Sequence, residues 1–141
     1  MIVADTGAIV ALVDADDRHH ARLRRLFERD PDAWILPWAI LPEVDYLLGA
    51  HVSGRAEENF LADLASGAWA VEWGDPADLP RADEITRRHR ALHLGLVDSV
   101  VMAVAERRRA AAIATLDLRH FGAVTLRSRP RLLPRDLDEG G

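Results

Sequence analysis

Short apolar runs alternate with longer amphipathic stretches along most of the chain. Each run is only four or five residues long and has no polar alternation, which is typical of strands buried on both faces. The runs predict four strands, at 1–4, 33–36, 68–72 and 110–114, and a fifth, edge strand is expected at 123–126. Apolar residues at helical spacing predict the helices, which we expect at 8–13, 17–29, 43–49, 55–65, 79–91 and 98–109.

Strands that alternate with helices predict an α/β fold in which a mostly parallel sheet of four to five short strands carries helices on both faces. The length of 141 residues suits one domain, which we place at 1–135. We expect the polar and glycine-rich segment 136–141 to be a frayed C-terminal tail. Thr6, a residue type favoured at helix starts and two positions before the helical pattern begins at Ala8, is the expected N-cap of the first helix.

The amino-acid composition excludes several kinds of catalytic and metal-binding site. The chain has no cysteine, which excludes thiol nucleophiles, disulfides and zinc–thiolate sites. All 18 basic residues are arginine, so lysine-based chemistry is excluded as well, and the net charge of -5 does not suit a uniformly basic nucleic-acid-binding protein. The N-terminus has no basic region, and Asp5 and Asp14 interrupt its apolar runs, so we expect neither a signal peptide nor a membrane span, and a cytoplasmic location.

Four acids stand at positions where a sheet-top pocket is expected. Asp5 ends the first predicted strand, Asp117 follows the fourth, and Asp98 starts the helix that leads into the fourth. Glu43 lies among apolar residues in the helix after the second strand, where a carboxylate would be costly to bury alone. Ligands of open α/β sheets bind at the carboxyl ends of the strands, so the joint placement of these acids predicts a shared site.

Each acid also has a purely structural interpretation. Asp5 could brace a tight turn, Asp98 could be a helix N-cap, Asp117 could cap a short turn, and Glu43 could be solvated or paired with an arginine. The functional hypothesis therefore depends on all four acids together. Clustered carboxylates repel one another, a divalent cation relieves the repulsion, and oxygen ligands suit Mg²⁺ or Mn²⁺.

The segments around these acids resemble, in chain order, the four motifs of PIN-domain nucleases. They are VADTGA at 3–8, PEVDYL at 42–47, LVDSVV at 96–101 and ATLDLRHF at 114–121. Each motif is short, but together they cover nearly the whole chain in the family's order. One departure is Ser99 after the third acid, where many relatives have alanine; serine is small enough that we expect no loss of activity.

The resemblance implies a PIN-like three-layer sandwich and, for so compact a chain, a toxin of the VapC type: a Mg²⁺-dependent endoribonuclease for which Mn²⁺ can substitute. It implies that Asp5 and Asp98 are the principal metal ligands, that Glu43 and Asp117 complete the pocket, and that Thr6 orients a metal-bound water. It further implies an RNA substrate, a small antitoxin protein as partner, and a homodimer.

Further expectations and alternatives accompany this hypothesis. Arg119, beside Asp117, is the candidate contact to a substrate phosphate, and an apolar strip on the helices after Trp38 or Arg55 is a candidate surface for a dimer or an antitoxin helix. A structure-specific DNA nuclease of the same fold and a non-catalytic, partner-binding pseudo-nuclease remain open. A phosphatase with Asp5 as nucleophile is less consistent, since Gly7 stands where such enzymes carry a second aspartate.

Overall fold

The structure, a computed structural model, describes residues 1–137 and contains one parallel five-stranded sheet in that range. Its strands are β1 (Ile2–Ala4), β2 (Trp34–Pro37), β3 (Val71–Glu72), β4 (Ala112–Ala114) and β5 (Arg131–Leu133). The spatial order is β3-β2-β1-β4-β5, and every neighbouring pair is parallel. The predicted parallel sheet is thereby confirmed.

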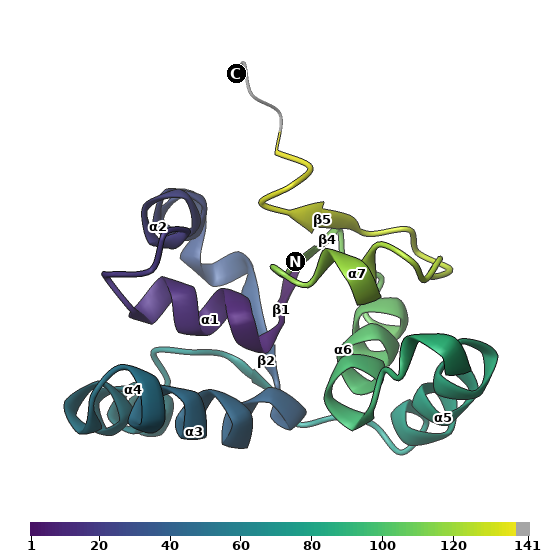
Figure 1. The fold of residues 1–141 in the computed structure, drawn as a ribbon, viewed down its shortest axis with the longest axis horizontal. Helices are drawn as coiled ribbons and strands as arrows, with labels where there is room; N and C mark the ends of the chain where they lie inside the picture. Colours follow the sequence, from purple (N-terminus) through teal and green to yellow (C-terminus); the bar gives the residue numbers. More distant parts are fainter. Residues whose placement is uncertain (138–141) are drawn as a thin grey trace.

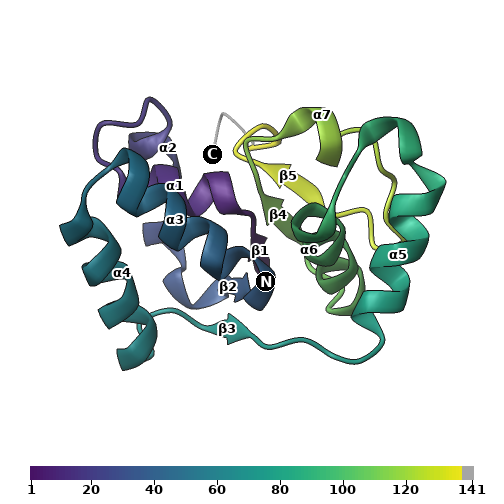
Figure 2. The same cartoon turned by 60° about the horizontal axis from the view of Figure 1, so that its bottom comes forward.

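Helices cover both faces of this sheet (Figure 1, Figure 2). Right-handed crossovers place the helices between β1 and β3 on one face and those between β3 and β5 on the other, because the chain reverses its direction across the sheet after β3. The first group is α1 (Thr6–Val13), α2 (His20–Arg29), α3 (Leu41–His51) and α4 (Gly54–Ser66), and the second is α5 (Asp78–Arg88), α6 (Leu96–Arg107) and α7 (Leu118–Phe121). The expected three-layer sandwich is confirmed.

The connections from β1 and from β4 leave the sheet in opposite directions. β1 leads outward to β2 on one side, and β4 leads outward to β5 on the other, so a switch point lies between β1 and β4. At such a point the two departing connections leave a crevice at the carboxyl edge of the sheet. Residue 5 and residues 115–117, which follow β1 and β4, therefore border the same crevice.

The core explains why the strands read as continuous apolar runs. Val3, Ala4, Ile113 and Ala114 are completely buried between the two helical layers. Helix α6 is enclosed more fully than an amphipathic stripe would require, since every residue from Ser99 to Ala105 is buried. The buried α6 places its N-terminal turn beside the carboxyl edge of the sheet.

Ionic contacts fix α5 and α6 to the segment around β3. The guanidinium of Arg107 donates to Asp78 Oδ1 at 2.7 Å and to Glu72 Oε1 at 3.0 Å, and both acids are buried. Arg81 of α5 donates to Glu106 of α6 at 2.7 Å. Much of the arginine content near 107–109 therefore serves intramolecular pairing, because a buried carboxylate requires a partner.

Three local expectations are wrong. The fifth strand is Arg131–Leu133 and not 123–126, where Val124 and Leu126 instead pack from a loop into the core. Asp5, and not Thr6, is the N-cap of α1. Helix α6 begins at Leu96 after the positive-φ residue Gly95, so Asp98 lies inside its first turn and does not cap it.

The C-terminal segment is described only as far as Leu137. Asp136 accepts a hydrogen bond from the backbone N–H of Leu132 at 2.8 Å, and Leu137 packs against the core. Residues 138–141 of the expected tail lie outside the described range, and the domain boundary stays a prediction. Within residues 1–137, no helix is sufficiently long and apolar to traverse a bilayer.

Candidate active site

Asp5 is the most deeply buried acid at the carboxyl edge of the sheet, with only 5% of its surface exposed. Its backbone caps α1, but its side chain makes no capping hydrogen bond. Instead, Oδ2 accepts a 2.9 Å hydrogen bond from the hydroxyl of Thr115, which follows β4. The first and fourth strands thus cooperate to position this carboxylate.

Burial raises the pKa of Asp5 from its ordinary value of 3.8 to about 6. Hydrogen bonds from the Thr6 backbone and the Thr115 hydroxyl oppose this rise in pKa, whereas the negative charges of Asp98 and Asp117 add to it. The folded protein therefore holds an acid whose charged form is unfavourable without a cation nearby.

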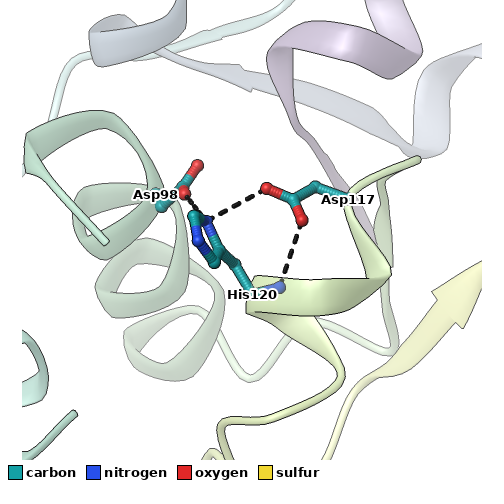
Figure 3. A group of neighbouring side chains, drawn as sticks. All are labelled: Asp98, Asp117 and His120. Atoms are coloured by element: carbon teal, nitrogen blue, oxygen red, sulfur yellow. Dashed lines mark hydrogen bonds and ion pairs between the residues drawn. The ribbon is translucent and has the colours of Figure 1, made fainter. Parts of the chain in front are cut away.

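Asp98 and Asp117 face each other across the crevice, with His120 between them (Figure 3). His120 Nδ1 lies 2.6 Å from Asp98 Oδ2 and 3.1 Å from Asp117 Oδ2. The other oxygen of Asp117 accepts the backbone N–H of His120 at 3.1 Å, which caps α7. The structural interpretation of Asp117 as a cap is thus correct, and its second oxygen still faces Asp98.

Glu43, the fourth acid, interacts electrostatically with Asp98. Burial is the largest cause that raises the pKa of Asp98, the hydrogen bond with His120 opposes it, and the charges of Asp117 and Glu43 raise it further. Glu43 lies in the first turn of α3 and is exposed, which agrees with the solvated interpretation of this residue. It nevertheless lies near enough to Asp98 for the two charges to interact.

Thr6 and Arg119 occupy opposite environments. Thr6 is 4% exposed, and its hydroxyl oxygen is buried with no hydrogen-bond partner among the residues described. An orphaned hydroxyl next to a buried carboxylate fits a place for a water molecule or an ion. Arg119 is exposed on the short helix α7, immediately after the loop that carries Asp117.

These residues fit a hard divalent cation. Asp5, Asp98 and Asp117 come from three different segments; the charges of Asp98 and Asp117 raise the pKa of Asp5, and the charge of Asp117 raises the pKa of Asp98. In addition, one ligand atom from each of Asp98, Asp117 and His120 can be chosen so that all three lie within 4.8 Å of one another. Carboxylate oxygens at this density suit Mg²⁺ or Mn²⁺, which would compensate the mutual repulsion.

The family model of the PIN domain matches residues 2–125, which include all four acids. The chain belongs to the PIN-domain family. A curated relative, Ribonuclease VapC26 of Mycobacterium tuberculosis, is 32% identical over 123 residues, which is 87% of this chain and 91% of that protein. This relative shows that the PIN domain described here is of the VapC type.

Two solved structures share the fold of this PIN domain. Mycobacterium tuberculosis VapC20, described as a toxin that cleaves the sarcin–ricin loop, superposes with a TM-score of 0.77 at 24% identity and covers 87% of this chain and 95% of its own. FitAcB from Neisseria gonorrhoeae superposes with a TM-score of 0.64 at 15% identity, covering 94% and 96% of the two chains. At these identities, both comparisons support the three-layer fold.

Two site residues of the PIN domain were not identified from the sequence. Thr115 precedes Asp117 by two positions, and its role depends on the strand pairing of β1 and β4, which the sequence alone does not give. His120 follows Asp117 by three positions, the spacing at which residues share a helix face. That spacing could have indicated that, in a short helix beginning at Asp117, the side chain of His120 lies close to the Asp117 carboxylate.

Proposed function

We propose that this PIN domain is a Mg²⁺-dependent endoribonuclease and the toxin of a toxin–antitoxin pair. The observation that carries the proposal is the convergence of Asp5, Asp98 and Asp117, with Glu43 beside Asp98, at the switch point of the sheet. The name of the relative at 32% identity supports RNA as the substrate. Mn²⁺ should substitute for Mg²⁺, because it accepts the same oxygen ligands.

The proposed roles follow from the positions of the side chains. Asp5 and Asp98 would be the principal ligands, because Asp5 is buried beneath the crevice and Asp98 has one oxygen outside its contact with His120. Asp117 and Glu43 would complete the pocket from the α7 and α3 sides. When bound, the cation would supply the water that attacks, polarise a phosphoryl oxygen and stabilise charge on the leaving oxygen.

Thr6 and Arg119 would act on the reactants. The Thr6 hydroxyl is buried and lacks a partner in the described part of the chain, so it could hold the attacking water in one orientation. The exposed guanidinium of Arg119 would grip a phosphate of the RNA backbone, for which its planar fork is suited. The hydrogen bond from Thr115 would keep the Asp5 carboxylate in its place throughout.

Induction in a bacterial host without antitoxin tests this proposal. We expect the wild-type protein to arrest growth and to produce discrete RNA fragments, whereas Asp5→Asn should do neither. Asp83→Asn is the matched control, because Asp83 is an exposed acid of α5 paired only with Arg87 in the structure described. If Asp5→Asn and wild type produce the same fragments, the acid cluster is not the source of cleavage.

The same experiment distinguishes the alternatives. Loss of chromosomal or plasmid DNA with intact RNA would favour a DNA nuclease of this fold. Growth arrest that persists in a soluble, folded Asp5→Asn protein, with no nucleic acid cut, would favour a non-catalytic binding protein.

The partner proposal concerns an apolar groove on the α3–α4 face. Leu61 and Trp73 are 64% and 74% exposed there, and apolar side chains line the groove between them: Leu41, Pro42, Phe60, Leu64, Ala65 and Val71. We propose that an amphipathic segment of the antitoxin docks in this groove, and that the toxin itself is a homodimer. Co-expression with the antitoxin tests the docking: Leu61→Asp should escape neutralisation and retain its cleavage of RNA, and full neutralisation of Leu61→Asp would contradict it. Light scattering of the purified protein tests the dimer.

A further inference from the structure

The imidazole of His120 lies between two carboxylates, although the cap of α7 uses only its backbone N–H. Its backbone N–H donates to Asp117 Oδ1, and the single turn of α7 then brings the imidazole into the space between Asp98 and Asp117 (Figure 3). The same nitrogen, Nδ1, faces both acids, at 2.6 Å and 3.1 Å. His120 is about 80% buried at this position, so its side chain is held in place.

One proton on Nδ1 cannot form good hydrogen bonds to both carboxylates. Nδ1 carries at most one proton, and two carboxylate oxygens on opposite sides compete for it. A cation shared by the three side chains would satisfy all of them at once. Neighbouring ligands of an octahedral ion with bonds of about 2.1 Å lie roughly 3 Å apart. The 3.1 Å separation of Nδ1 from Asp117 Oδ2 matches this value, and the 2.6 Å separation from Asp98 Oδ2 needs an increase of a few tenths of an ångström.

We propose that His120 is itself a ligand of the metal ion, through Nδ1, and that this nitrogen shifts the preference of the site from Mg²⁺ toward Mn²⁺. The inference rests on the proposed metal-dependent function and adds a ligand to the four acids. Magnesium binds oxygen ligands and accepts nitrogen poorly, whereas imidazole suits first-row transition ions. A site with one imidazole and several carboxylates therefore discriminates between the two ions more strongly than carboxylates alone.

Pulsed electron paramagnetic resonance of the Mn²⁺-loaded protein tests the proposal without reference to activity. A directly bound imidazole gives a ¹⁴N coupling in the Mn²⁺ spectrum, and we expect this coupling in the wild type. In His120→Asn the coupling should disappear, because the amide offers only its oxygen to the metal while it can still donate to the carboxylates. The matched control is His51→Asn, since His51 is exposed at the end of α3 and away from the acids. Its spectrum should be that of the wild type.

Equilibrium titrations with Mn²⁺ and with Mg²⁺ measure the preference of the site for one ion over the other. We expect His120→Asn to lose affinity for Mn²⁺ by about tenfold or more, a loss typical when a group that supports a metal site is removed, and to lose much less affinity for Mg²⁺. Thermal unfolding verifies that the variant is folded. The wild-type spectrum alone also tests whether a nitrogen atom is bound to Mn²⁺.

Each contrary outcome has a distinct meaning. If Mn²⁺ binds to the wild type without ¹⁴N coupling, or if His120→Asn keeps the wild-type ratio of Mn²⁺ to Mg²⁺ affinity, His120 is not a ligand while the metal site itself stands. If both ions bind more tightly to His120→Asn, the imidazole is a competitor of the ion, and the proposal is overturned. If neither ion binds to the wild type, the proposed metal-dependent function fails together with it.

Discussion

The hydroxyl of Thr115 donates a 2.9 Å hydrogen bond to Asp5 Oδ2, although the two residues are 110 positions apart in the chain. The oxygen of the same hydroxyl accepts the backbone N–H of Asp117 at 3.0 Å. This side chain thus connects the ends of β1 and β4 and fixes both the buried carboxylate and the turn that carries its neighbour.

Thr115→Val should therefore damage the site while leaving the fold in place. Valine has the same shape but neither donates to Asp5 nor accepts from Asp117, and each buried group left without a partner costs about 1–3 kcal/mol. We expect RNA cleavage to fall by roughly tenfold to 100-fold, in line with the loss of a group that orients a metal ligand. Thr125→Val, on an exposed loop position, is the control. Cleavage at the wild-type rate in Thr115→Val would contradict this role.

Asp5→Asn should stabilise the metal-free protein at pH 7.5 although it abolishes cleavage. The asparagine side chain keeps an oxygen for the Thr115 hydroxyl and removes a buried negative charge. The difference between a pKa of about 6 and the ordinary 3.8 corresponds to roughly 3 kcal/mol at most. Urea unfolding in the presence of a chelator measures it. A loss of stability in Asp5→Asn would show that the charge of Asp5 does not destabilise the metal-free folded protein.

The stabilisation by Asp5→Asn should also depend on pH in a defined direction. The folded-state pKa of Asp5 is raised, so the folded protein binds this proton more tightly than the unfolded chain does, and the wild type loses stability as pH rises from about 4 to about 6. The free-energy difference between the variant and the wild type should grow over that window and level off above it. Unfolding curves of both proteins at pH 4, 5, 6 and 7.5 provide the comparison, and a difference that is constant with pH would be inconsistent with the raised pKa.

Arg107→Ala should be among the most destabilising surface-accessible substitutions. It would leave Asp78, which is 3% exposed, without the guanidinium that pairs with it, whereas Glu72 would lose one of two guanidinium partners and keep Arg108. Removing one partner of a buried ion pair costs about 3–5 kcal/mol. Arg87→Ala is the comparison, since its pair with Asp83 is exposed and should contribute less than about 1 kcal/mol. Equal unfolding midpoints for the two variants would refute the structural role of Arg107.

The sequence predicted the fold well because its apolar runs are buried on both faces. Strands such as β1 and β4 are so enclosed that they read as uninterrupted apolar segments, and their alternation with helices left few arrangements open. The fifth strand was misplaced because Val124 and Leu126 are as apolar as a strand requires but pack from a loop. β5 begins with the exposed Arg131 and contains only two buried residues, which gives a weak periodic signal.

The site was predictable in its acids and less so in its supporting groups. Asp5 and Asp117 could be placed together because both follow buried strands, and parallel strands end at one edge. The contacts of Thr115 and His120 depend on strand order and on one turn of α7, which periodicity does not encode. The apolar chain neighbours of Glu43 left its burial open, and in the structure the helix turns it outward while Val44 and Leu48 face the core.

Cleavage of purified RNA, with and without Mg²⁺, by the wild type and by Asp98→Asn tests the central claim most directly. Asp98 interacts electrostatically with Asp117, His120 and Glu43. Asparagine at this position removes the charge with little change of shape. The account predicts discrete fragments only from the wild type and only with the divalent ion, and none after addition of a chelator. Fragments that persist in Asp98→Asn, or in the wild type with chelator, would contradict a metal-dependent nuclease centred on these carboxylates.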